Sequence, residues 1–237
     1  MTMVGLGLAV ATPAVQAAEF SEAELYFELN DSAGDLGIHS SIDGPPNLGV
    51  QIFDPSDKMI LSIAPRGRLA KQGLTQLFFE SAEPTFAELA PATFFARFPE
   101  GEYEITGRTL LGERLEADVE LSHVLAARPG NITANGVPAV GCGVVPLPVI
   151  SAPVFIEWEP VTGSHPTIGR FGAVEIDRYE FFVEREGVKM GIELPPEVNH
   201  FEIPADILAL GNQFKYEIIA RTTTGNNTAV EACFTLL

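Results

Sequence analysis

The sequence predicts an all-β protein made of two antiparallel β-sandwich domains in series. Hydrophobic residues make up 46% of the 237 residues and charged residues 19%, which is typical of a chain that folds around a core. The chain has 22 Gly, 18 Pro and 16 Phe, so turns and aromatic strand residues are frequent. Between the turns, apolar and polar residues alternate with the period of two that half-buried strands show.

Residues 1–17 are predicted to be a signal peptide. The stretch from Val4 to Val15 is apolar and has small side chains, and Ala17 precedes the expected cleavage point. This stretch of about a dozen residues is shorter than the ~20 that a membrane span needs, and no later segment resembles a span. The first basic residue is Lys58, so the usual positive start is missing, and an ordinary N-terminal strand is the alternative. The expected location is secreted or periplasmic.

The block 18–128 is expected to form the N-terminal β-sandwich, of Ig-like or jelly-roll type. It is interpreted as a bacterial-type sandwich with no assigned family. Alternation predicts strands over 24–29, 48–53, 59–63, 74–79, 103–109 and 115–121. The region 85–96 could hold one helical turn, which Pro91 limits.

The segment 129–148 is predicted to be a linker. It is nearly uncharged and rich in Gly, and it contains Pro129, Pro138, Pro146 and Pro148. Such a composition is typical of a semi-stiff connector between folded units.

The block 149–237 shows the clearer strand pattern. Val154, Ile156 and Trp158 alternate with polar or outward residues, and the same rhythm continues through the rest of the block. Further strands are expected around 179–183, 190–194, 201–203, 214–221 and from 228 onward, with turn residues at 225–227.

The order of residues in this block resembles the fibronectin type III family. The resemblance rests on Pro153, Trp158-Glu159-Pro160, Tyr179-x-Phe181-x-Val183, Phe201-x-Ile203, Leu208 with Gly211-Asn212, and Phe214-x-Tyr216-x-Ile218-x-Ala220. It covers about 85 residues and implies a sandwich whose core is filled by Trp158. Phe214 stands where the family usually has Tyr, so no tyrosine corner can form there. The resemblance implies a fold and little about function, because such domains are mostly spacers and binding modules.

The two cysteines, Cys142 and Cys233, are expected to form a disulfide. Val230, Ala232 and Phe234 share one parity of the last strand, so Cys233 points away from the core, where a partner could reach it. The bond would close a loop of about 90 residues in an oxidising compartment. Two unpaired small residues are the alternative.

The net charge of −18 excludes whole classes of partner. Nucleic-acid binding needs a basic surface that neutralises phosphate, and so does docking on anionic lipid. No nucleic acid is therefore expected among the partners of this protein, and no membrane span is expected because no segment is long and apolar enough.

Acidic turns suggest a Ca²⁺ site. Ca²⁺ takes six to eight oxygen ligands in flexible geometry, and carboxylate and amide oxygens gather in two turns of the N-terminal block. The candidate ligands are Asn30, Asp31, Asp35, Asp54 and Asp57. The spacing does not match an EF-hand, and simple turn formation is the alternative.

No motif indicates catalysis. The chain contains four His, at positions 39, 123, 165 and 200, with no metal-ligand spacing, and they are expected at the surface or at strand ends. No G-x-S-x-G, P-loop or dinucleotide motif occurs. The pairs Phe78-Phe79, Phe94-Phe95 and Phe181-Phe182 would each direct one ring away from the core of a sandwich.

Together these patterns predict an exported, non-catalytic binding or structural module with a protein or glycan partner. A Ca²⁺-dependent adhesion or carbohydrate-binding module is the first alternative. An enzyme or inhibitor whose site is not visible in the sequence is the second.

Overall fold

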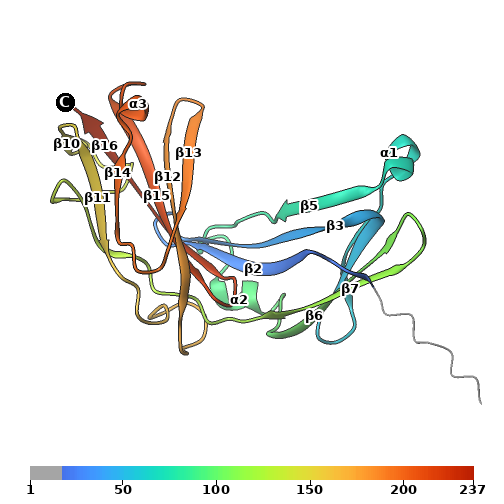
Figure 1. Cartoon of the computed structure of the whole chain (residues 1–237). Coiled ribbons are helices and arrows are strands. Elements are labelled where there is room, and N and C mark those ends of the chain that lie inside the picture. Colours follow the sequence, from blue (N-terminus) through green and yellow to red (C-terminus); the bar gives the residue numbers. More distant parts are fainter. Residues whose placement is uncertain (1–17) are drawn as a thin grey trace, which may run out of the picture.

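The computed structural model describes residues 18–237 and consists of strands with three short helices. The predicted signal peptide lies outside the described residues. Two β-rich units meet at an angle, so that the molecule has the outline of a V (Figure 1). The all-β fold class predicted from alternation is confirmed.

The N-terminal unit is organised around one long strand, β3 (Asp35–Phe53). Before Gly44-Pro45-Pro46 this strand pairs mainly with β2 and β5, and after it with β4 and β6. Because proline has no N–H to donate, the ladder is interrupted there and the strand can change partners. The other elements are β1 (Ala18–Glu19), β2 (Glu22–Asn30), β4 (Met59–Ile63), α1 (Gly67–Gln72), β5 (Leu74–Glu80), α2 (Pro91–Phe95), β6 (Gly101–Thr109) and β7 (Arg114–Leu121).

Two local predictions for this unit are wrong. Asp35 and Gly37 belong to the first half of β3, although the acidic, Gly-containing stretch from Leu29 to Gly37 suggested a loop. Phe94 and Phe95 do not lie on opposite faces of a strand: α2 begins at Pro91, and both rings are buried against Phe27. Proline suits the first turn of a helix because the N–H that it lacks would have no helical partner.

The C-terminal unit is a two-layer sandwich. One layer has the order β14-β11-β8-β9, and the other has β13-β12-β15-β16. Its elements are β8 (Gly130–Ala134), β9 (Val137–Pro138), β10 (Val149–Ile150), β11 (Val154–Glu159), β12 (Ile176–Arg185), β13 (Val188–Leu194), β14 (His200–Ile203), α3 (Ala205–Leu208), β15 (Gln213–Thr222) and β16 (Asn227–Leu236). Trp158 is buried between the layers and packs edge-on against Tyr179 with 5.5 Å between ring centroids.

The expected linker over 129–148 is wrong in part, because this segment contributes to the C-terminal sandwich. β8 pairs with β11, and Ile132 and Ala134 are buried in the same core as Trp158. The segment reads as a connector because its strands are short and its prolines are many. Ile132 and Ala134 are buried because β8 pairs with β11, about 20 residues later in the chain, and composition does not reveal this pairing.

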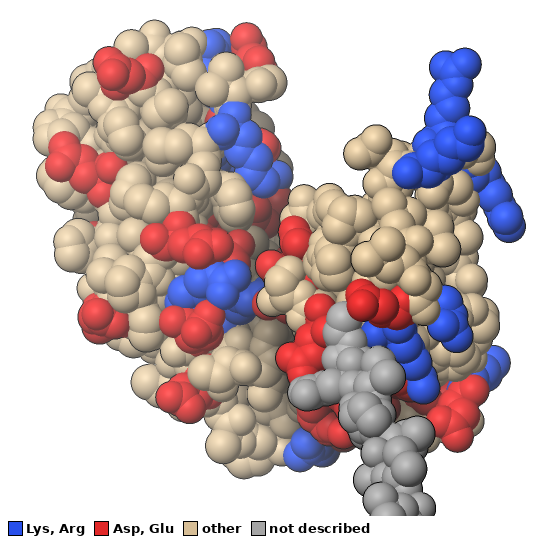
Figure 2. Space-filling model, turned by 45° about the vertical axis from the view of Figure 1, so that its right-hand side comes forward, with Lys and Arg blue, Asp and Glu red and all other residues tan. Residues whose placement is uncertain are grey.

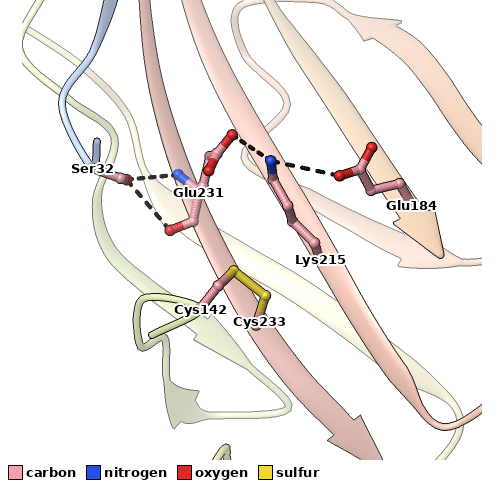
Figure 3. The surroundings of a disulfide bond; sticks show 6 residues. All are labelled: Ser32, Cys142, Glu184, Lys215, Glu231 and Cys233. Carbon is pink, nitrogen blue, oxygen red and sulfur yellow. Dashed lines mark hydrogen bonds and ion pairs between the residues drawn. A yellow bond between two sulfur atoms is a disulfide. The ribbon is translucent and has the colours of Figure 1, made fainter. Parts of the chain in front are cut away.

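The disulfide between Cys142 and Cys233 is present, as predicted. It ties the loop before β10 to the outward side of β16, next to Lys215 and Glu231 (Figure 3). The neighbouring residues Ala232 and Phe234 are buried, which confirms the inferred parity of this strand.

The two units keep separate hydrophobic cores but share one sheet, which the sequence does not predict. Where they meet, β2 runs parallel to β16, with Glu28 opposite Asn227 and Asn30 opposite Ala229. We call this junction the seam. The 12-stranded sheet therefore passes from one sandwich into the other without a break.

Asn226 completes the seam with its side chain. It is fully buried, its Oδ1 accepts a hydrogen bond from the backbone N–H of Phe27, and its Nδ2 donates to the carbonyls of Ser122 and Val124. Thr228 adds a bond from its hydroxyl to the carbonyl of Ala126. One asparagine thus satisfies three backbone groups of the N-terminal unit and its exit segment.

Replacing Asn226 should destabilise the whole protein. Asn226→Ala leaves three backbone groups without their partners, and each buried unsatisfied group costs ~1–3 kcal/mol, so we expect a loss of about 3–5 kcal/mol in the free energy of unfolding. Urea denaturation followed by fluorescence would measure it. Asn212→Ala is the control, because Asn212 is exposed and its side chain makes no hydrogen bond. Equal stability of the two variants would contradict the role given to Asn226.

Candidate functional site

The candidate site is the face of the 12-stranded sheet that points into the V. We call it the inner face. Side chains of one parity on seven neighbouring strands form it, and they come from both units. Figure 2 shows the two lobes standing apart, with carboxylates gathered where they meet. The inner face includes Phe182, Lys189, Lys215, Glu217, Arg221, Asn227, Glu231, Tyr26, Glu28, Asp35, His39 and Phe78.

The part of the inner face that the C-terminal unit contributes, which we call its wall, carries alternating charges. Lys215 Nζ lies 2.6 Å from Glu231 and 3.5 Å from Glu184 (Figure 3). Lys189 lies 4.2 Å above the ring of Phe182 and 3.8 Å from Glu217. Most charges on this wall already have a partner. A ligand would therefore meet hydrogen-bonding groups and aromatic rings rather than unpaired charges.

Glu217 is the most perturbed acid of this wall. It is opposite Glu231 in the β15–β16 register. Burial raises the pKa of Glu217 to about 7, with Glu231 and Glu28 adding to the shift and Lys189 opposing it. Its charge therefore changes within the neutral pH range.

At the seam, aromatic and cationic groups contact one another in a row. The guanidinium of Arg221 lies 4.6 Å from the ring centre of Tyr26, Tyr26 lies 5.5 Å from His39, and His39 lies 6.3 Å from Phe78. Arg221 is only 4% exposed and is held by Glu24 at 2.7 Å. Burial raises the pKa of Tyr26 to about 12, so its hydroxyl stays protonated. Phe78 ends the row and is 58% exposed.

Two carboxylates flank His39. Its Nε2 lies 2.8 Å from Glu83 Oε1, and its Nδ1 lies 3.9 Å from Glu28 Oε2. Asn227 donates a hydrogen bond of 2.9 Å to Glu28 from across the seam. Asp35 lies nearby on β3; burial raises its pKa to about 6, and the charges of Glu83, Glu231 and Glu28 add to this shift.

The residues predicted to bind Ca²⁺ are not brought together as one site. Asn30, Asp31 and Asp35 lie at the β2–β3 turn, whereas Asp54 and Asp57 lie at the β3–β4 turn. These turns are at opposite ends of the 19 residues of β3. At ~3.3 Å per residue, roughly 60 Å of strand separates them.

Most of these five residues have structural partners instead. Asn30 Oδ1 accepts the N–H groups of Ser32 and Ala33, and Asp54 Oδ1 accepts those of Ser56 and Lys58, as turn-forming residues do. Asp57 has a φ of 60° in the same turn as Asp54.

Asp31 links the two units on the other side of the seam. Its oxygens lie 3.0 Å from His165 Nε2 and 3.0 Å from Arg128 Nη1. Burial alone would raise the pKa of Asp31, but the hydrogen bonds from His165 and Arg128 outweigh it and lower the pKa. His165, like His39, is buried, so the expectation that these two histidines lie at the surface is wrong.

Sequence reasoning missed the grouping of Glu28, His39 and Glu83. His39 stands in a segment for which no strand is predicted, and Glu83 follows β5 by three residues. The signal that could have revealed it is alternation: Tyr26 and Glu28 share one parity of β2, and His39 belongs to the same face of the next strand. Only the pairing of β2 with β3 shows that those parities coincide.

Comparisons with known proteins give limited information. No protein-family model and no curated protein matches the chain. Among solved structures, the human OSCAR ligand-binding domain is 12% identical over 92% of this chain and 98% of its own, with a TM-score of 0.29. A segment of two fibronectin type III domains from chicken tenascin is 11% identical over 91% of this chain and 98% of its own, with a TM-score of 0.29.

A Ca²⁺-stabilised adhesin with which an Antarctic bacterium binds ice is 13% identical and covers 91% of this chain, with a TM-score of 0.27. The present chain spans half of that adhesin structure.

Neutralising Glu217 should stabilise the protein at high pH. Because the pKa of Glu217 is higher in the folded state, the folded state holds its proton longer, and stability falls as pH rises from about 4.5 to about 7. Glu217→Gln removes this penalty. We expect it to raise the free energy of unfolding by up to about 3.5 kcal/mol at pH 8, since raising the pKa from 4.5 to about 7 costs ~1.4 kcal/mol per pKa unit, and to have little effect at pH 4.

Thermal melts of the wild type and Glu217→Gln across pH 4–8 would measure the difference. Glu197→Gln serves as the matched control, because Glu197 is exposed and forms no ion pair. A gain in stability that is the same at both ends of the pH range would refute the assignment of the shift to Glu217.

Proposed function

We propose that the protein is an exported, non-catalytic binding module that holds a protein or glycan ligand on the inner face. The observation that carries this proposal is the seam: it fixes two sandwiches at one angle, so that side chains of both units face the same space. Preorganised surfaces bind with less loss of conformational freedom than mobile ones. The C-terminal unit is proposed to be a fibronectin type III-like domain, in keeping with its strand order and with Trp158 in its core.

The chemistry of the inner face suits such a ligand. Phe78 is an exposed ring of the inner face, and rings of this kind anchor both protein and sugar surfaces. The neighbouring charges are mostly paired, so they add hydrogen bonds and direction to the contact. A net charge of −18 opposes anionic polymers as ligands.

The disulfide supports an oxidising compartment for this protein. A bond between residues 91 positions apart persists in oxidising surroundings, such as the periplasm or the extracellular space. Within residues 18–237, none of the helices has the length and apolar character needed to cross a bilayer. Export through a signal peptide comprising residues 1–17 completes this proposal.

Loss of the Phe78 ring should weaken ligand binding. We expect Phe78→Ser to reduce binding about tenfold or more, as removal of a central aromatic anchor does. Binding of the wild type would first be measured on a printed glycan array and on a panel of purified cell-surface proteins. Phe171→Ser is the control, because Phe171 is 86% exposed but lies in the β11–β12 loop, outside the inner face.

Two results would contradict the binding role of this face. One is that the wild type binds neither panel. The other is that Phe78→Ser and Phe171→Ser bind equally well.

Export predicts a shorter mature chain. Expressed with its own N-terminus in a bacterial host, the protein should be recovered from the periplasm or medium with Ala18 as its first residue. N-terminal sequencing and intact mass, with and without reductant, would show the cleavage point and the disulfide together. An uncleaved chain that remains in the cytosol with free thiols would overturn the proposed location.

A further inference from the structure

Glu28, His39 and Glu83 form a group with the donor chemistry of a metal site. One oxygen of each carboxylate and one imidazole nitrogen all lie within 4.8 Å of one another. Ligands around a tetrahedral zinc ion lie roughly 3.4 Å apart, given bond lengths of ~2.0–2.2 Å. The glutamate side chains are 23% and 28% exposed and can rotate by the small amount required, whereas His39 is held in place.

The fold builds this group from three separate segments. Glu28 comes from β2, His39 from β3 opposite it, and Glu83 from the loop after β5. His39 is 95% buried and is flanked by the rings of Tyr26 and Phe78, which limit its rotation. Asn227 fixes Glu28 from the other unit. Such supporting partners are what orient the ligands in metal centres.

Gly37 makes room for the third ligand. A Cβ at this position would overlap the carboxylate of Glu83 and would come within 3.0 Å of His39 Nε2. Glu83 can therefore reach the imidazole only because residue 37 has no side chain. Gly37 thus offers a way to displace Glu83 without changing a ligand.

The negative charges of the Glu28 and Glu83 carboxylates have little compensation from nearby basic residues. Across residues 18–237, no Lys or Arg lies within 4 Å of a carboxylate oxygen of Glu28 or Glu83, and His39 is their one basic neighbour. Most acids on the adjoining wall are paired with Lys215, Lys189 or Arg221. A divalent ion at this position would compensate both carboxylates.

We propose that Glu28, His39 and Glu83 bind a divalent transition-metal ion, for which Zn²⁺ is the probe. An imidazole nitrogen with two carboxylate oxygens suits Zn²⁺ better than Ca²⁺, which takes six to eight oxygens. With three protein ligands, a further coordination position is left for water or for a group of a bound molecule. Because Glu28 is hydrogen-bonded to Asn227, the ion would also stabilise the seam.

The test is calorimetric titration of the full, EDTA-treated chain with Zn²⁺ and, separately, with Ca²⁺. We expect one saturable Zn²⁺ site per chain, a higher Tm with Zn²⁺, and no such response to Ca²⁺. Loss of an outer-shell partner alone costs roughly 10–100-fold in metal affinity, so loss of a ligand in Glu83→Gln or His39→Gln should cost about 100-fold or more. Gly37→Ala should weaken binding about tenfold or more by the same scale.

Two controls separate this site from general attraction of cations and from misfolding. Glu80→Gln removes an exposed acid opposite His39 on β5 that is not part of the group, and it should bind Zn²⁺ as the wild type does. Circular dichroism checks the fold of each variant. If His39→Gln fails to fold, Glu83→Gln and Gly37→Ala still decide the question, because Glu83 is partly exposed and Gly37→Ala leaves all three ligands in the chain.

A Co²⁺ spectrum gives a second readout, since the visible bands of bound Co²⁺ report ligation and should vanish in Glu83→Gln. Three outcomes overturn the proposal: no saturable Zn²⁺ binding, unchanged affinity in a folded Glu83→Gln variant, or tighter binding of Ca²⁺ than of Zn²⁺. The titrations need no knowledge of the ligand of the inner face, so their failure would leave the proposed binding function standing.

Discussion

The parallel pairing of β2 with β16 is the constraint on which the rest of the structure depends. The ladder is short, so its backbone hydrogen bonds alone would hold the units weakly. Asn226 and Thr228 add bonds to four backbone groups of the opposite unit and its exit segment, and Asp31 adds its contacts with His165 and Arg128. Because these groups are mostly buried, rotation about the seam would leave several of them without partners. The two sandwiches therefore behave as one body.

The seam also explains the electrostatics of the inner face. In an isolated sandwich, the outward-facing side chains of a sheet lie in water, where acids keep their ordinary pKa values. Here such rows from both units meet, and burial together with nearby carboxylates raises the pKa of Glu217 to about 7 and that of Asp35 to about 6. Lysine, arginine and histidine partners lie along the same face. A protein with 32 acidic residues could have kept these carboxylates apart; the fold concentrates some of them at the junction.

Binding and metal ligation would share this junction but use different parts of it. Phe78 and the paired charges form the walls, while Glu28, His39 and Glu83 lie at the floor beside the seam. An ion at the floor would hold β2, β3 and the loop after β5 together, and through Asn227 it would reach the C-terminal unit. The same contacts that keep the angle of the V would thus keep the geometry of the ligands.

The sequence by itself determined the parts of the structure that depend on local pattern. Alternation located β4, β5, β11, β12, β15 and β16, the resemblance to fibronectin type III domains implied a core filled by Trp158, and the parity of Cys233 was correct. Tertiary structure alone decided the strand at 35–43, the strand β8 in the expected linker, and the seam. The strand at 35–43 and β8 have weak local preference and become strands because partner strands satisfy their backbone, whereas the seam joins two strands that alternation already predicts. The grouping of Glu28, His39 and Glu83 also depends on strand pairing, because these residues share a face only after β2, β3 and β5 have paired. The alternation within one strand does not show which other strand it pairs with or in which register.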